Sequence, residues 1–84
     1  TGTPPFESDW TYWKITFKTN WDGLFTLELK TGKTGHIAVD QHVSAGVVYQ
    51  SIIIGYTGSP FFVVLAAPED GKWTIQVEPD PVYN

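Results

Sequence analysis

Apolar and polar residues alternate with a period of two along most of this chain, a pattern typical of β-strands with one face in water. The alternation covers residues 10–18, 24–30, 36–43 and 72–78. The positions predicted to face the core are Trp13, Ile15, Phe17, Phe25, Leu27, Leu29, Ile37, Val39, Val43, Trp73, Ile75 and Val77.

Two further segments, residues 47–55 and 60–67, are apolar at both parities. A strand that is covered on both faces shows such a continuous run, so we expect these two strands at the centre of the fold. Turn residues at 56–59 and 68–71 flank the second run, which predicts a β-hairpin over residues 56–78 with Gly71 at a positive φ. Asp22-Gly23 predicts a second hairpin.

The chain therefore contains about six short strands, and none of its segments has helical periodicity. A single sheet would leave its apolar face in water. We predict an all-β fold, a small two-layer and mostly antiparallel β-sandwich, with a closed barrel as the alternative. The domain is expected at residues 10–78. Proline-rich tails at 1–9 and 79–84 resemble the linkers of a module within a longer protein.

Composition narrows the classes of partner. The 84 residues include no cysteine and carry a net charge of −4, with five lysines and no arginine. Binding to nucleic acid or to an anionic membrane surface calls for clustered cations, so we expect neither. No apolar run is long enough to span a membrane, so we expect no membrane insertion. We expect this sequence to be a mature or excised piece from which any targeting segment has been removed.

The sequence contains histidine and acidic residues that are candidate ligands for a metal ion. His36, Asp40 and His42 share one face if their strand is regular, and residues two apart lie ~6.6–7 Å from each other. The alternative is three polar side chains facing water. Acidic residues in turns and the C-terminal tail, Asp22, Glu69, Asp70 and Asp80, are oxygen ligands of the kind that calcium prefers. We expect no cofactor, with a structural calcium ion as the alternative.

No nucleophile lies in a Gly-x-Ser-x-Gly motif and only two histidines are available as bases, so we expect no enzyme activity. Aromatic residues outside the core pattern are stronger candidates. We expect Trp10 and Trp21 to fold back over the ends of the sandwich. The alternative is that Trp10, Tyr12 and Trp21 form a sugar-stacking platform, which would make this domain a carbohydrate-binding module.

The segment Phe61-Phe62-Val63-Val64-Leu65-Ala66-Ala67, a short turn and then Gly71-Lys72-Trp73-Thr74-Ile75-Gln76-Val77-Glu78 resembles the ending of small secreted bacterial β-sandwich modules, such as pre-peptidase C-terminal-type domains. The resemblance implies a non-catalytic accessory domain that is extracellular or on the cell surface. Its expected partners are neighbouring domains, a glycan or a surface protein, and it assigns no site residues.

Self-assembly is a further alternative. Residues 52–54 and 61–67 are strongly β-prone, and either run would recruit another chain if it lay at the edge of a sheet.

Overall fold

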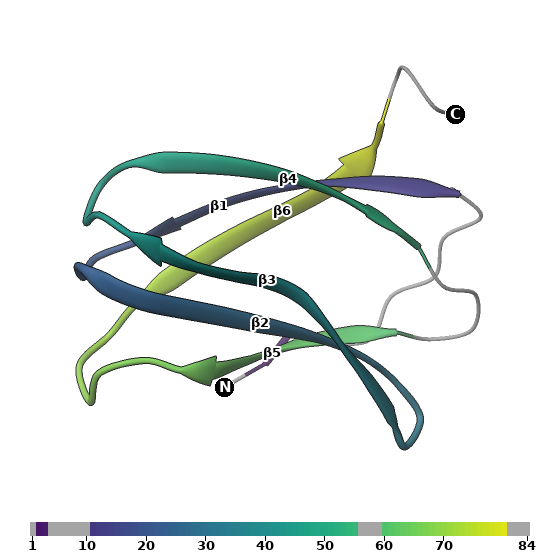
Figure 1. Cartoon of the computed structure of the whole chain (residues 1–84), viewed down its shortest axis with the longest axis horizontal. Helices are drawn as coiled ribbons and strands as arrows, with labels where there is room; N and C mark the ends of the chain where they lie inside the picture. The colour runs from purple at the N-terminus through teal and green to yellow at the C-terminus, as the bar shows by residue number, and fades with distance from the viewer. Residues whose placement is uncertain (1, 4–10, 56–59, 81–84) are drawn as a thin grey trace.

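The computed structural model describes residues 2–3, 11–55 and 60–80. Six strands form two antiparallel sheets of three, which face each other without closing into a barrel, and the described residues contain no helix (Figure 1). This confirms the predicted all-β two-layer sandwich. The strands are β1 (Tyr12–Thr19), β2 (Gly23–Thr31), β3 (Thr34–Val43), β4 (Val48–Ile54), β5 (Phe61–Ala66) and β6 (Trp73–Pro79).

The strand order corrects the prediction for the two continuous apolar runs. One sheet has the order β4-β1-β6 and the other β3-β2-β5, so β1 and β2 are the central strands. β4 and β5, expected at the centre, both lie at edges. A continuous apolar run shows that both faces of the strand tolerate apolar side chains. It does not determine whether the strand has one neighbour in its sheet or two.

The connections also differ from the prediction. β2 and β3 form the one hairpin among the described strands, with Gly32 at φ 61° in its turn. The turns at Asp22-Gly23 and at residues 68–71 instead lead from one sheet to the other, so the two predicted hairpins are wrong. Gly71 does not have a positive φ; it is required because a Cβ there would lie 2.9 Å from Cδ of Pro68.

The core lies between β1 and β2, where the predicted alternation is confirmed. Trp13, Ile15 and Phe17 of β1 are buried. Phe17 stacks on Phe25 of β2 with ring centroids 5.0 Å apart, and on Tyr49 of β4 at 5.6 Å. The remaining buried apolar side chains are Trp21, Leu27, Leu29, Val39, Val43, Phe62 and Val64, with Trp73, Ile75 and Val77 partly buried against them.

A β-bulge interrupts the pairing of β2 with β3. Leu27 pairs with Val39, whereas the next residue, Glu28, pairs with Ile37, so Ala38 is the extra residue. Because side chains alternate between the two faces, one extra residue reverses the parity of the strand beyond it. Ile37 is therefore 56% exposed, and the prediction that it faces the core is wrong.

The first residues of the chain pair with β5. Gly2 forms an antiparallel bridge with Val63. The Thr3 amide donates to the Phe62 carbonyl at 2.9 Å, and the Phe62 amide donates to Thr3 Oγ1 at 2.9 Å. These contacts differ from what a free linker at residues 1–9 would show; residues 4–9 lie outside the described part of the chain.

Candidate functional site

The structure describes two of the three aromatic candidates, and these two lie in different surroundings. Trp10 lies outside the described residues. Tyr12 is half-buried at the start of β1, opposite Ile54 of β4. Trp21 is only 8% exposed, its Nε1 donates to the Leu24 carbonyl at 3.2 Å, and its ring centroid lies 6.0 Å from that of Phe25. The expectation that Trp21 folds back over the end of the sandwich is confirmed, because the crossing from β1 to β2 places the indole over the end of the core.

The bulge separates the histidines and aspartate expected on one face. His36 pairs with Leu29, a core-facing residue, whereas Asp40 pairs with Thr26 and His42 with Leu24 on the opposite face. Their strand is not regular, so the premise of a shared face is wrong. Asp40 Oδ1 accepts a hydrogen bond from Thr26 Oγ1 at 3.2 Å.

His36 lies instead beside an apolar hollow of about 260 Å³ between the β3 and β4 edges, which is lined by Leu29, His36, Ile37, Ala38, Ile53 and Ile54. The hollow offers apolar surface, with His36 as its only titratable side chain.

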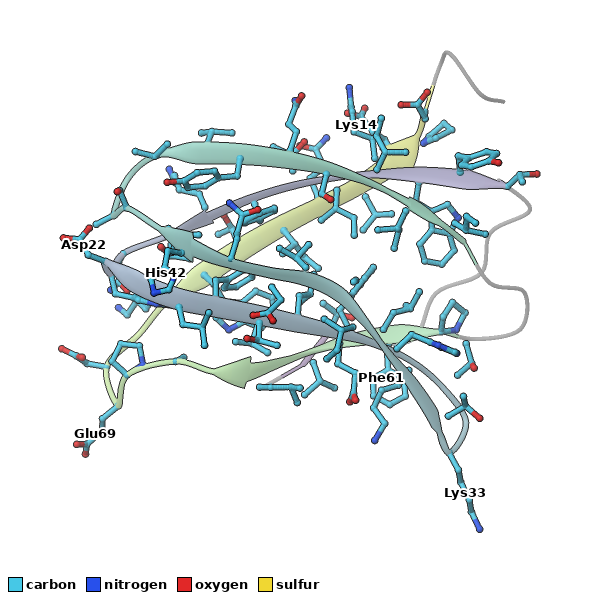
Figure 2. The ribbon with its side chains drawn as sticks, viewed as in Figure 1. Lys14, Asp22, Lys33, His42, Phe61 and Glu69 are labelled. Atoms are coloured by element: carbon cyan, nitrogen blue, oxygen red, sulfur yellow. The ribbon has the colours of Figure 1, made fainter. Side chains whose placement is uncertain are left out.

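The acidic candidates for calcium are dispersed. Asp22 Oδ1 accepts the Ala45 amide at 2.8 Å, so this carboxylate ties the β1–β2 connection to the β3–β4 connection. Glu69 and Asp70 are exposed in the β5–β6 connection, and Asp80 is buried after β6. Figure 2 shows Asp22 and Glu69 on separate turns. Within residues 2–3, 11–55 and 60–80, no three His, Asp or Glu side chains are grouped as a metal site would require.

Apolar side chains gather along β4, which contains the β-prone run at residues 52–54 and lies at the edge of its sheet. Val48, Ile52 and Ile54 have one parity on β4 and are 60%, 49% and 63% exposed. They lie on the face of the β4-β1-β6 sheet that is turned away from the core, which we call the outer face. We call these three side chains the β4 row. β4 runs along the upper border of the molecule in Figure 1.

Apart from Tyr12, the rest of the outer face is polar. Lys14 and Glu78 form an ion pair at 3.2 Å across β1 and β6, and Lys14 is labelled in Figure 2. A shallow hollow of about 300 Å³ lies further along the same face. Its lining combines hydroxyl, amide and ammonium groups with one member of the β4 row: Thr16, Phe17, Lys18, Val48, Thr74, Ile75 and Gln76.

The backbone of β4 adds a second feature. The Gly55 amide donates to the Thr11 carbonyl at 2.9 Å, which shows that backbone groups of odd-numbered residues here point toward β1. Hydrogen bonding alternates along an antiparallel strand, so Val48, Gln50, Ile52 and Ile54 direct their N–H and C=O groups to the open side. None of the described strands pairs with that side.

One signal in the sequence could have located this surface. Residues 43–68 contain no charged side chain, and β4 lies within that stretch. We interpreted the stretch as two buried strands because apolar content alone does not distinguish a covered face from an exposed one.

These observations define the class of protein: a small two-layer antiparallel β-sandwich with an apolar row along one open edge strand. No protein-family model, curated protein or solved structure matches the chain. The part of the chain that the structure describes has no helix with the length and apolarity needed to cross a membrane.

Proposed function

We propose that this domain is a non-catalytic interaction module of an exported or cell-surface bacterial protein, and that the β4 row is its contact surface. The observation that carries the proposal is the exposure of Val48, Ile52 and Ile54 together on one strand. Apolar side chains scattered singly over a surface need no explanation, whereas several on one face of one strand mark a contact site. Ile52 and Ile54 are adjacent on that face, and Gln50 lies between Ile52 and Val48. Export and a bacterial source rest on the resemblance of residues 61–78 to secreted accessory modules.

The neighbours of the β4 row support a protein partner. Tyr12, opposite Ile54, extends the apolar surface onto β1, and a tyrosine combines apolar area with a polar tip. The Lys14–Glu78 ion pair lies beside it, as polar groups do at the rim of a protein interface.

The carbohydrate-binding alternative depends on different residues. The hollow lined by Thr16, Lys18 and Gln76 offers the hydroxyl, ammonium and amide groups that bind sugar hydroxyls. With Trp21 buried, however, the stacking platform is reduced to Tyr12 and to Trp10, which lies outside the described residues. We therefore place this alternative second.

The test measures retention of the fluorescently labelled protein on bacterial cell-envelope fragments, before and after these are treated with protease. We compare the native chain with Ile54→Lys, which places a charge in the β4 row, and with Gln76→Lys, a control on the same face of β6. The proposal expects retention that Ile54→Lys weakens about tenfold or more, a loss of about 1.4 kcal/mol, and that Gln76→Lys preserves.

The two partner classes are separated by the protease step. Retention that disappears after protease treatment supports a protein partner. Retention that survives the treatment and is lost in Gln76→Lys but kept in Ile54→Lys supports the carbohydrate alternative and overturns the role of the β4 row. If folded protein is not retained on either preparation, the proposed interaction function is wrong.

A further inference from the structure

The four sheet edges of the described sandwich are not equally protected against pairing with another chain. On β3, a bulge and the side chains of His36, Asp40 and His42 interrupt the edge. On β5, Gly2 and Thr3 already pair with the strand. Bulges, charges and covering segments are the usual devices that prevent edge-to-edge association.

The β6 edge carries a proline. The Asp80 amide donates to the Tyr12 carbonyl, so residues of even number on β6 bond toward β1, and Pro79 faces the open side. Proline has no N–H to donate, which interrupts pairing on that side. Glu78 and Lys72 add charge at the two ends of the strand.

Within residues 2–3, 11–55 and 60–80, β4 has none of these devices. It is regular along its whole pairing with β1, and Val48–Ile54 contains no proline, glycine or charged residue. Its outward backbone groups belong to the same residues, Val48, Ile52 and Ile54, that form the exposed row. An edge strand that is regular, uncharged and partly apolar on its exposed face is a template for pairing with another strand.

We propose that the occupant of this edge is β4 of a second copy of the chain, paired antiparallel. This inference rests on the proposed interaction function and names its partner. The argument for a second copy is complementarity: a neutral strand meets no like charge when it pairs with itself, and like charges opposite each other would be unfavourable.

The register follows from the positions of the backbone groups. A two-fold axis at Ser51 pairs Gln50 with Ile52 of the second copy, and Val48 with Ile54 of the second copy. All four are residues whose N–H and C=O groups point to the open side, so the ladder is complete. Even-numbered residues meet even-numbered residues, which keeps both outer faces on the same side. The most exposed members of the β4 row, Val48 and Ile54, thereby cover each other.

This pairing closes on itself. The same patch is used on both copies, so the interface is isologous and stops at two. The joined sheet has the order β6-β1-β4-β4-β1-β6, and Pro79 lies on both of its outer edges. A dimer is expected, and further growth into a fibre is not.

The experiment combines sedimentation velocity with backbone amide exchange over a concentration series from about 10 µM to 1 mM, a range in which weak dimers form. The key variant is Gln50→Lys and the matched control is Gln76→Lys. Both glutamines are exposed and both flank Thr16 on the outer face, one on β4 and one on β6. The same substitution is therefore compared inside and outside the proposed interface.

The inference expects a concentration-dependent dimer in the native chain and in Gln76→Lys, and at least about tenfold weaker association in Gln50→Lys, because two ammonium groups meet near the axis. It also expects exchange at the amides of Val48, Gln50, Ile52 and Ile54 to slow as concentration rises, while those of Tyr49, Ser51 and Ile53, which face β1, do not change.

A monomer across the whole range overturns the pairing. So does a dimer whose association is equally weakened by both variants, or one in which the amides of β4 are unaffected. The envelope retention described above is measured at a labelled-protein concentration where the chain is monomeric. If self-pairing is absent but envelope retention still depends on Ile54, the dimer proposal is wrong and the interaction function is kept. The two proposals therefore fail on different measurements.

Discussion

β4 and β5 are alike in carrying no charge and differ in their surroundings. Each is a short edge strand with apolar side chains on both faces, and each belongs to a different sheet. β5 buries Phe62 completely and has Gly2 and Thr3 along its side, whereas β4 leaves Val48, Ile52 and Ile54 exposed with no described strand beyond it. An apolar edge strand can therefore be completed within its own chain or left open to another one.

The largest loss of stability is expected from removing Phe62, the buried aromatic side chain of β5. Phe62 is fully buried and its ring lies 6.2 Å from that of Trp13, so Phe62→Ala should lower the free energy of unfolding by about 3–5 kcal/mol. Urea denaturation followed by tryptophan fluorescence measures it. Leu65→Ala on the same strand is the control, because Leu65 is 53% exposed, and its cost should stay below about 1 kcal/mol. Equal costs would contradict the assignment of β5 faces.

The next effect concerns the end of β4. A Cβ at Gly55 would overlap the indole of Trp13, which is buried and has little room to move. Gly55→Ala should therefore destabilise the domain by about 1–3 kcal/mol. Thermal unfolding by circular dichroism measures this loss. Gly32→Ala is informative beside it: open space surrounds Gly32, so its smaller cost of about 1 kcal/mol arises from the positive φ alone.

A smaller effect is expected from uncovering β5. Thr3→Val removes the Oγ1 that accepts the Phe62 amide, and the loss of one such hydrogen bond costs about 0.5–1.5 kcal/mol. Amide exchange at Phe62 should accelerate in the same variant. Thr74→Val, exposed on β6, serves as the control and should change neither quantity. Unchanged exchange at Phe62 would show that the N-terminal residues do not protect this edge.

The smallest effect on stability is expected in the β4 row itself. Ile54→Lys places a charge on a side chain that is already 63% exposed, so the free energy of unfolding should change by no more than about 0.5 kcal/mol. Chemical denaturation at a concentration where the chain is monomeric measures it. A loss of several kcal/mol would mean that Ile54 contributes to the core and not to a contact surface.

The sequence predicted the fold class and most of the core, and the reason lies in β1 and β2. Trp13, Ile15 and Phe17 alternate with polar residues, and a central strand with one face in water leaves this simple pattern. The prediction failed at Ile37, because a single bulge reverses parity and local sequence does not reveal it. The prediction also failed for β4 and β5, which lie at sheet edges and not at the centre of the fold. Apolar content does not specify which strands are neighbours in a sheet.

The candidate site was less predictable than the fold. The polar residues around Trp21 are compatible with both a buried and an exposed ring, and it is the crossing between sheets that folds this ring over the core. His36, Asp40 and His42 were grouped on the assumption of a regular strand. The sequence marks residues 52–54 as prone to pair only if they lie at an edge. It does not show that they are exposed, because exposure is a property of the assembled sheets and no local pattern distinguishes Ile54 from a buried isoleucine.

The connections between the sheets bear on how fast the domain folds. β1 pairs with β6 so that Trp13 lies opposite Pro79, near the other end of the chain, and β2 and β3 alone are joined as a local hairpin among the described strands. Folds dominated by such distant pairings reach the native state in milliseconds to seconds, slowly for a small domain. At about 5–20 residues per second during synthesis, β1 remains without its last neighbour for several seconds after it emerges. The uncharged strands are then exposed before the sandwich can close, so the yield of folded protein should depend on synthesis rate and on chaperones.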